Sequence, residues 1–283
     1  MLANCDQDAP AKRAYARAGP EFCTVILLVF TTGLAATGYF CNSMSEGMSM
    51  PGGWTMSMMW MRMPGQTWLA SAAMFMLMWL AMMVAMMLPS SLPLMLRDYH
   101  ARRSGNSPGA MILTLLMATG YFFVWSAVGM AVYMVGTLFA LATMRWTALS
   151  QATPLILGIM IFIAGCLQFM PWTMYGLRRC RGMLPCEMPP AQGCASTSWW
   201  LGISRGVSCV ACCSGPTLVL LALGMMNAAV MVMVAAVITM EKLMPKPELM
   251  VRIFGMISVV TGLIIISNLI WQAFNPAMTG PQI

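Results

Sequence analysis

Residues 68–88 read WLASAAMFMLMWLAMMVAMML, and this stretch decides the fold class. It contains 21 residues and no charged side chain. An α-helix needs about 20 consecutive apolar residues to cross the hydrocarbon core of a bilayer. The stretch therefore predicts a membrane-spanning helix, and similar runs elsewhere in the chain predict further spans.

The composition of the whole chain agrees with a membrane protein. Hydrophobic residues make up 60% of the 283 residues and charged residues only 8%, whereas a soluble globular domain is about 25% charged. The same composition excludes intrinsic disorder. A single His excludes bis-His haem and three-His zinc sites. No acid lies inside a long apolar run, which argues against a proton relay through buried carboxylates.

Seven apolar runs are long enough to be candidate spans. Gly224–Asn227, where the fifth run gives way to the sixth, predicts the tip of a tight hairpin, because one continuous helix over both runs would be about 57 Å long. The predicted fold class is therefore all-α, a polytopic bundle of about seven transmembrane helices. The seven runs are Phe22–Phe40, Trp68–Leu88, Met111–Leu141, Pro154–Trp172, Gly206–Leu223, Met226–Leu243 and Ile253–Trp271.

Basic residues are distributed unequally between the loops on the two sides of this bundle. Of the 15 Lys and Arg residues, 13 fall in segments on one side, and only Arg62 and Arg145 fall on the other. Cytoplasmic loops carry this excess, so we expect a cytoplasmic N-terminus, an external C-terminus and a multi-pass protein of the bacterial inner membrane. The net charge of +7 is then explained by topology, and no nucleic-acid partner is expected.

The predicted organisation has five parts. Residues 1–21 form a cytoplasmic tail, residues 22–40 an uncleaved anchor helix, and residues 41–67 a Met-rich outer loop. Residues 68–273 form a six-helix membrane domain that includes a Cys-containing cytoplasmic segment at 173–205, and residues 274–283 form a tail.

The outer loop is the first candidate metal site, because eight of the residues from Met44 to Met63 are Met. Thioether sulfur is a soft, neutral ligand that selects Cu(I) over hard cations, and it forms no disulfides in an oxidising compartment. The alternative is that Met fills space in an interfacial loop as a flexible apolar side chain. The candidate ligands are Met48, Met50, Met56, Met58, Met59, Met61 and Met63.

The second run continues the pattern into the membrane. Met74, Met78, Met82 and Met86 recur every four residues and lie near one helix face, with a drift of about 40° per step. Such a ladder would pass Cu(I) without a buried negative charge, and ordinary helix packing is the alternative. Pro89 and Pro93 are expected to end the helix. The candidate ligands on this helix are Met78, Met82, Met83, Met86 and Met87.

The third candidate is a cluster of cysteines at the start of the fifth run. Cys209 is followed by Cys212 and Cys213 at i+3 and i+4, so the three thiols share a helix face. Thiols are strong Cu(I) and Zn ligands, and the cytoplasm keeps them reduced; metal or redox chemistry and apolar packing both remain open. Three flanking arginines are expected to lower the pKa of Cys180. Glu241 is unfavourable near a helix C-terminus and should have a partner such as Arg252 or Arg205.

Two stretches resemble a known family. Met82–Ser90 resembles the Ala-Met-Met-x-Pro-Ser signature of the bacterial family of predicted metal-binding integral membrane proteins, a family of unknown function. The stretch from Cys212-Cys213 through Leu223–Asn227 to Glu241–Pro245 resembles its second signature. The resemblance implies a polytopic helical protein with suspected metal binding. Its motifs include Pro89, Asn227, Glu241 and Lys242, which we expect to be structural or gating residues. Ser214-Gly215-Pro216 departs from the family pattern, in which an aromatic follows the cysteine pair.

The main functional prediction is a membrane protein that binds Cu(I) through Met and Cys and passes it across or into the membrane. Its expected partners are the lipid bilayer and either subunits of a membrane complex or a copper chaperone. The alternative is an accessory subunit of a larger membrane complex, which small residues such as Gly129 and Gly158 would help to pack. The sequence shows no nucleophile–base pair or phosphate-binding loop, so we expect no enzyme activity.

Overall fold

The computed structural model describes residues 20–43, 47–50, 54–57, 60, 65–104, 109–181, 194–244 and 247–274. Within these ranges the chain forms eight helices and one small sheet. The helices are α2 (Pro20–Ser43), α3 (Trp68–Ser104), α4 (Ala110–Arg145), α5 (Thr147–Gln168), α6 (Pro171–Cys180), α7 (Ala195–Leu223), α8 (Ala228–Leu243) and α9 (Pro247–Phe274). The strands are β1 (Gly47–Met50) and β2 (Trp54–Ser57).

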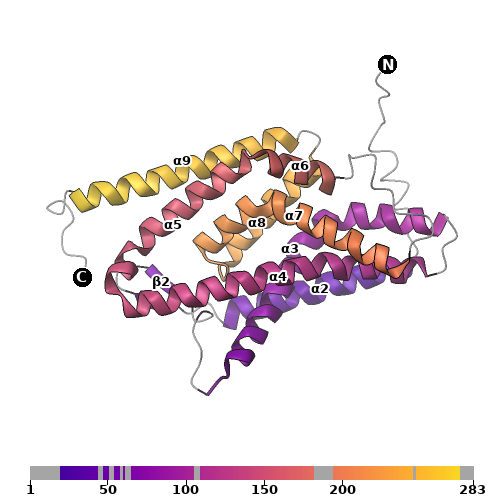
Figure 1. Ribbon diagram of the computed structural model, residues 1–283, viewed down its shortest axis with the longest axis horizontal. Helices are drawn as coiled ribbons and strands as arrows, with labels where there is room; N and C mark the ends of the chain where they lie inside the picture. The colour runs from indigo at the N-terminus through magenta and orange to yellow at the C-terminus, as the bar shows by residue number, and fades with distance from the viewer. Residues whose placement is uncertain are drawn as a thin grey trace.

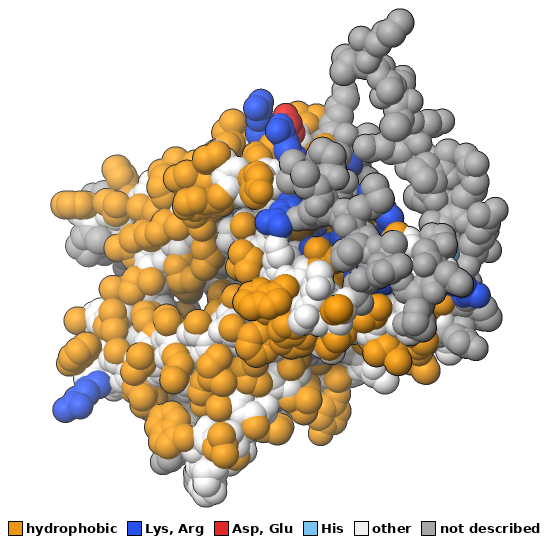
Figure 2. Space-filling view, turned by 45° about the vertical axis from the view of Figure 1, so that its right-hand side comes forward, with side chains coloured by type: hydrophobic (Ala, Val, Ile, Leu, Met, Phe, Trp, Pro, Cys, Tyr) orange, Lys and Arg blue, Asp and Glu red, His pale blue; other side chains and the backbone are white. Residues whose placement is uncertain are grey.

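Six of these helices are long and apolar enough to cross a membrane, which confirms a multi-pass helical protein. They are α2, α3, α4, α5, α7 and α9. The remaining candidate, α8, has 16 residues, fewer than the roughly 20 that a bilayer requires. Hydrophobic side chains cover most of the face shown in Figure 2, and Lys and Arg gather toward one end of it.

Helix α7 occupies the centre of the bundle and contacts α4, α5, α6 and α8. Helices α5 and α9 lie side by side along one flank, while α8 lies between them and α4 (Figure 1). The backbones of α4 and α7 approach closely: a Cβ at Gly202 would lie 2.1 Å from the Met117 carbonyl oxygen, and one at Gly120 would lie 2.6 Å from the Trp199 carbonyl oxygen. Small residues at a helix interface permit this approach.

The hairpin between α7 and α8 is confirmed. Helix α7 ends at Leu223, and Gly224 has φ +100°, a left-handed conformation that glycine adopts without strain. Asn227 then caps α8, its side-chain oxygen accepting hydrogen bonds from the backbone N–H groups of Ala229 and Val230. The structural role expected for Asn227 is therefore that of a helix N-cap.

The prediction that α3 ends at Leu88 is wrong. The helix continues through Pro89 and Pro93 to Ser104. The hydroxyl groups of Ser90 and Ser91 donate hydrogen bonds to the Met87 carbonyl oxygen at 2.9 and 2.8 Å. The carbonyl groups that Pro89 and Pro93 leave without an N–H donor are those of Ala85 and Pro89. Membrane helices tolerate such prolines where the surrounding bundle compensates for the lost hydrogen bond. Much of the predicted connecting segment 173–205 is likewise helical, in α6 and the first turns of α7.

Candidate metal centre

Four thiols meet beside the middle of α7. Cys209, Cys212 and Cys213 are buried on one face of this helix, as their spacing predicted, and Cys180 comes from the end of α6. The Sγ–Sγ distances are 3.8 Å for Cys209–Cys213, 3.5 Å for Cys212–Cys213 and 3.7 Å for Cys180–Cys212. The Sγ atoms of Cys180, Cys209 and Cys212 all lie within 4.8 Å of one another.

These separations suit a single soft ion. Two thiolates that bind one ion at about 2.3 Å each, in tetrahedral geometry, lie about 3.8 Å apart. A thioether completes the sulfur set, because Sδ of Met87 on α3 lies 4.0 Å from Sγ of Cys209. The donors therefore come from α3, α6 and α7, and they are the soft ligand types that Cu(I) prefers.

Cys180 is not among the ligands predicted from the sequence. Helix α6 packs tightly on α7 at Gly176, which has no side chain. A Cβ at this position would lie only 2.6 Å from the Ser208 carbonyl oxygen. Cys180 follows Gly176 by four residues and so lies on the same helix face. This spacing was the available signal, but the sequence does not reveal which helix that face contacts.

The expected effect of the flanking arginines on Cys180 is also wrong. Hydrogen bonding with Cys209 and burial raise the pKa of the Cys180 thiol to about 12, although the contact with Cys212 acts in the opposite direction. The arginines point elsewhere: Arg178 pairs with Glu248 and Arg179 donates to the Ser204 hydroxyl group. A nearby basic sequence therefore does not make Cys180 a reactive thiolate.

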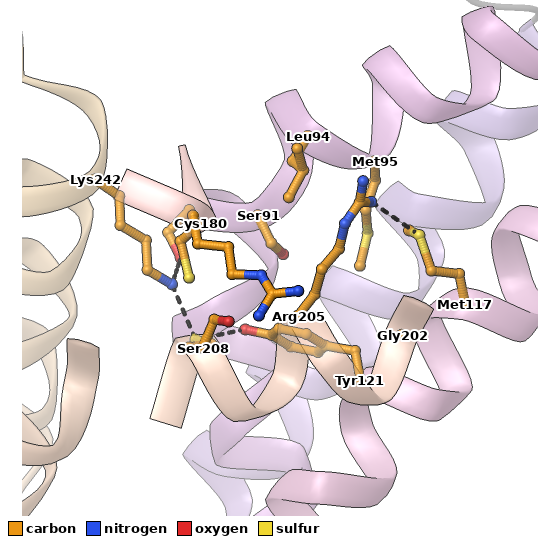
Figure 3. Close-up of a pocket in the computed structure, with 13 residues that line it drawn as sticks. Ser91, Leu94, Met95, Met117, Tyr121, Cys180, Gly202, Arg205, Ser208 and Lys242 are labelled. Atoms are coloured by element: carbon orange, nitrogen blue, oxygen red, sulfur yellow. Dashed lines mark hydrogen bonds between the residues drawn. The ribbon is translucent and has the colours of Figure 1, made fainter. Parts of the chain in front are cut away.

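Two polar side chains, those of Tyr121 and Lys242, donate hydrogen bonds to Cys209, and both lie beside the same cavity (Figure 3). The Tyr121 hydroxyl group on α4 donates to Sγ of Cys209 at 2.9 Å, and Nζ of Lys242 on α8 donates to the same sulfur at 3.2 Å. A cavity of about 20 Å³ adjoins them and is lined in part by Cys180, Cys209 and Lys242. A cavity of this volume has room for about one water molecule.

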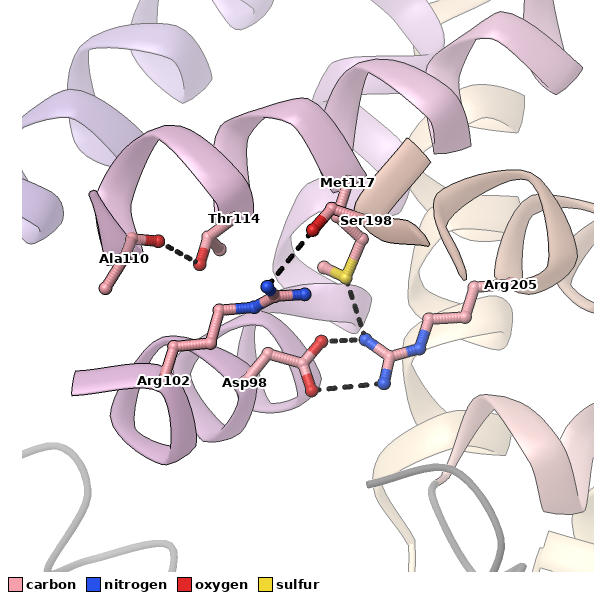
Figure 4. Close-up of polar contacts among 7 residues, drawn as sticks. All are labelled: Asp98, Arg102, Ala110, Thr114, Met117, Ser198 and Arg205. Atoms are coloured by element: carbon pink, nitrogen blue, oxygen red, sulfur yellow. Dashed lines mark hydrogen bonds and ion pairs between the residues drawn. The ribbon is translucent and has the colours of Figure 1, made fainter. Parts of the chain in front are cut away.

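The expected partners of Glu241 are wrong. Its carboxylate accepts a hydrogen bond of 3.0 Å from the Gln168 side chain on α5. Arg205 is engaged elsewhere, in a buried ion pair with Asp98 on α3, and it also contacts Sδ of Met117 at 3.0 Å (Figure 4). Pro89 lies within α3, next to Ser90, which accepts a hydrogen bond from Lys242.

The methionines of α3 are buried in the core. Met78, Met82, Met83, Met86 and Met87 are each at most 4% exposed, whereas Met74 is 43% exposed and so lies outside the ladder. Met87 connects this series to the thiols through its contact with Cys209. The other members reach no sulfur of the cluster through any contact described, so the ladder itself stays a prediction.

The outer Met loop contains a β-hairpin. Met48 pairs with Met56 across the two strands, and Met50 pairs with Trp54. The Trp54 indole N–H donates to the Ser150 carbonyl oxygen at 3.0 Å, which holds the hairpin near the start of α5. Met56 is buried and Met48 is exposed. The remaining candidates of the loop, Met58, Met59, Met61 and Met63, lie outside the described residues.

The fold and this cluster define a polytopic helical membrane protein with a buried site rich in soft sulfur ligands. The chain belongs to the PpoB2 copper chaperone family, whose model matches residues 76–265. This match includes all four clustered cysteines and the methionines of α3 from Met76 onward. No curated protein and no solved structure matches the chain.

Proposed function

We propose that this protein is a membrane-embedded copper chaperone that holds Cu(I) on its clustered thiols and transfers it to a copper-requiring partner. One observation carries the proposal: three thiols from two separate helices lie within 4.8 Å of one another in a buried site. Thiolates bind Cu(I) strongly, and membership of a copper chaperone family agrees with copper as the cargo. Copper is moved and not chemically transformed, so the proposed role is not enzymatic.

The proposed path begins at the outer Met hairpin and ends at the thiols. Along α4, Gly136 adjoins Trp60 of the outer loop, and Tyr121 adjoins Cys209. These two α4 positions are 15 residues apart, or about 22 Å along the helix axis. The buried methionines of α3 occupy the same interior, and thiolates bind Cu(I) more tightly than thioethers do, so the ligand strength increases toward Cys209.

The proposed topology has seven spans, with α8 as the short one. The N-terminus is then cytoplasmic, the C-terminus external and the location the bacterial inner membrane. The distribution of charge supports this orientation: the described basic residues lie mostly near the end of α3, in α6 and at the α8–α9 junction, while Arg145 lies at the opposite end of α4. The partners are the lipid bilayer and a copper-receiving chaperone or membrane complex.

A competition experiment tests copper binding. The full-length protein in detergent should remove Cu(I) from a chromophoric chelator, and a C180S/C209S/C212S variant should lose at least 90% of this capacity. Cys166→Ser is the matched control, because Cys166 is a free cysteine on α5 outside the cluster. Retention of Cu(I) by the triple variant, or absence of binding in the wild type, would contradict the proposal.

A further inference from the structure

Lys242 is a buried cation that faces the thiols. Its side chain is 7% exposed, and Nζ lies 3.2 Å from Sγ of Cys209, 3.2 Å from Oγ of Ser90 and 4.0 Å from Sδ of Met87. Burial of an ammonium group is costly unless a counter-charge accompanies it. The contacts of Lys242 therefore raise the question of which group supplies that charge.

Among the described residues, no carboxylate forms an ion pair with Lys242. Asp98 pairs with Arg205, and Glu241 accepts from Gln168. Within the described residues, the hydrogen bonds of the Lys242 ammonium group reach only sulfur and hydroxyl groups. The thiolate form of a cysteine, with Cys209 in direct contact, is thus the counter-charge that the geometry provides.

We infer that Lys242 is a specificity-determining residue that makes the site electrically neutral when two thiolates hold one monovalent soft ion. This inference rests on the proposed function and names its substrate class as Cu(I), with Ag(I) as its chemical analogue. One monovalent ion and two thiolates carry a net charge of −1, which the ammonium group of Lys242 cancels. A net charge in a buried, low-dielectric site is unfavourable, so this neutrality contributes directly to affinity.

The same charge count disfavours divalent ions. A divalent ion on two thiolates, with Lys242 beside it, leaves a net charge of +1. To remove this charge, a further thiol of the cluster has to lose its proton in the buried site, which a monovalent ion does not require. Replacement of Lys242 by a neutral residue reverses the preference: two thiolates then neutralise a divalent ion and leave a monovalent ion at −1. Lys242 acts here through Cys209 as a positioning residue, and it donates to the sulfur without binding the ion.

Lys242→Met and Lys242→Arg test the inference in full-length protein. The dissociation constants for Cu(I) and Zn(II) are measured by chelator competition, and the thermal midpoint of the metal-free protein is recorded. We expect Lys242→Met to weaken Cu(I) binding at least tenfold. The dissociation constant for Zn(II) divided by that for Cu(I) should also fall at least tenfold, which means that the preference for Cu(I) decreases. Lys242→Arg keeps the positive charge and should restore most of the Cu(I) affinity.

The outcomes separate the inference from the proposed function. A merely structural role would weaken both metals equally and lower the thermal midpoint, which would overturn the inference, as would unchanged affinities in Lys242→Met. If the wild-type protein fails to bind Cu(I), both the proposed function and the role of Lys242 are overturned. If the wild-type protein binds Cu(I) and Lys242→Met has the same dissociation constants, only the role of Lys242 is overturned. If Lys242→Met does not fold, Ser90→Ala removes one of the hydrogen bonds that orient the ammonium group and should shift the same ratio in the same direction.

Discussion

Asp98 and Arg205 connect α3 to α7 near the thiols. Nη2 of Arg205 donates to Oδ1 of Asp98 at 3.1 Å, Nη1 donates to Oδ2, and both side chains are buried. A guanidinium group and a carboxylate that meet in this two-bonded geometry form a strong, directional contact. Arg205 precedes Cys209 by four residues, so this pair orients the helix face that carries the cysteines.

Asp98→Asn should destabilise the protein, because it leaves Arg205 buried without its counter-charge. Removal of one partner of a buried pair costs about 3 kcal/mol, and we expect the thermal midpoint in detergent to fall by several degrees. Glu248→Gln is the control. The Glu248 side chain is 49% exposed and that of its partner Arg178 is 59% exposed, and exposed ion pairs contribute little to stability. An Asp98→Asn midpoint equal to that of Glu248→Gln would show that the buried pair does not stabilise the fold.

Part of the site could be predicted at the residue scale. The i, i+3 and i+4 spacing placed Cys209, Cys212 and Cys213 on one face, because helical geometry depends only on local sequence. Cys180 and Lys242 could not be assigned in this way. They lie 29 and 33 residues from Cys209, and their positions depend on how α6 and α8 pack against α7.

At the scale of helices, glycines set the distance between α4 and α7. Gly120 on α4 and Gly202 on α7 lie where the two backbones approach most closely. A methyl group added at Gly202 has no space, because the Met117 carbonyl oxygen of α4 lies next to it. The sequence predicted most helices because apolar run length is a local property. It misplaced the end of α3, because a membrane helix can continue through prolines when its neighbours support it, and this support depends on packing and not on local sequence.

Gly202→Ala should therefore separate α4 from α7. Overpacking of this kind costs about 1–3 kcal/mol, and the shift should also weaken Cu(I) binding, because α4 carries Tyr121 and α7 carries Cys209. Gly38→Ala is the matched control: an added Cβ at Gly38 meets no atom within 4 Å, and Ala is the better helix former. Thermal midpoints and Cu(I) affinities of both variants check this prediction, which fails if the two variants behave alike.

At the scale of the whole molecule, the candidate copper ligands form two separated groups. The Met48–Met56 pair lies in the outer hairpin, and the four thiols lie beside Lys242 in the bundle. The sequence predicted both groups but not their separation, which depends on how α3 and α4 cross the interior. The buried methionines of α3 are the sulfur atoms available between them.

A Met78→Leu/Met82→Leu/Met86→Leu variant separates transfer from binding. Leu and Met have similar volumes, so the exchange should cost less than about 1.5 kcal/mol per site, and the Cu(I) affinity of the thiols should not change. If these thioethers carry the ion, copper uptake into vesicles that contain the reconstituted protein should slow at least tenfold. The control is Met233→Leu/Met256→Leu, whose native side chains are 50% and 60% exposed and face away from the core. Equal uptake rates in the two variants would limit the methionines of α3 to packing, and the copper site would then consist of the thiols and Met87 alone.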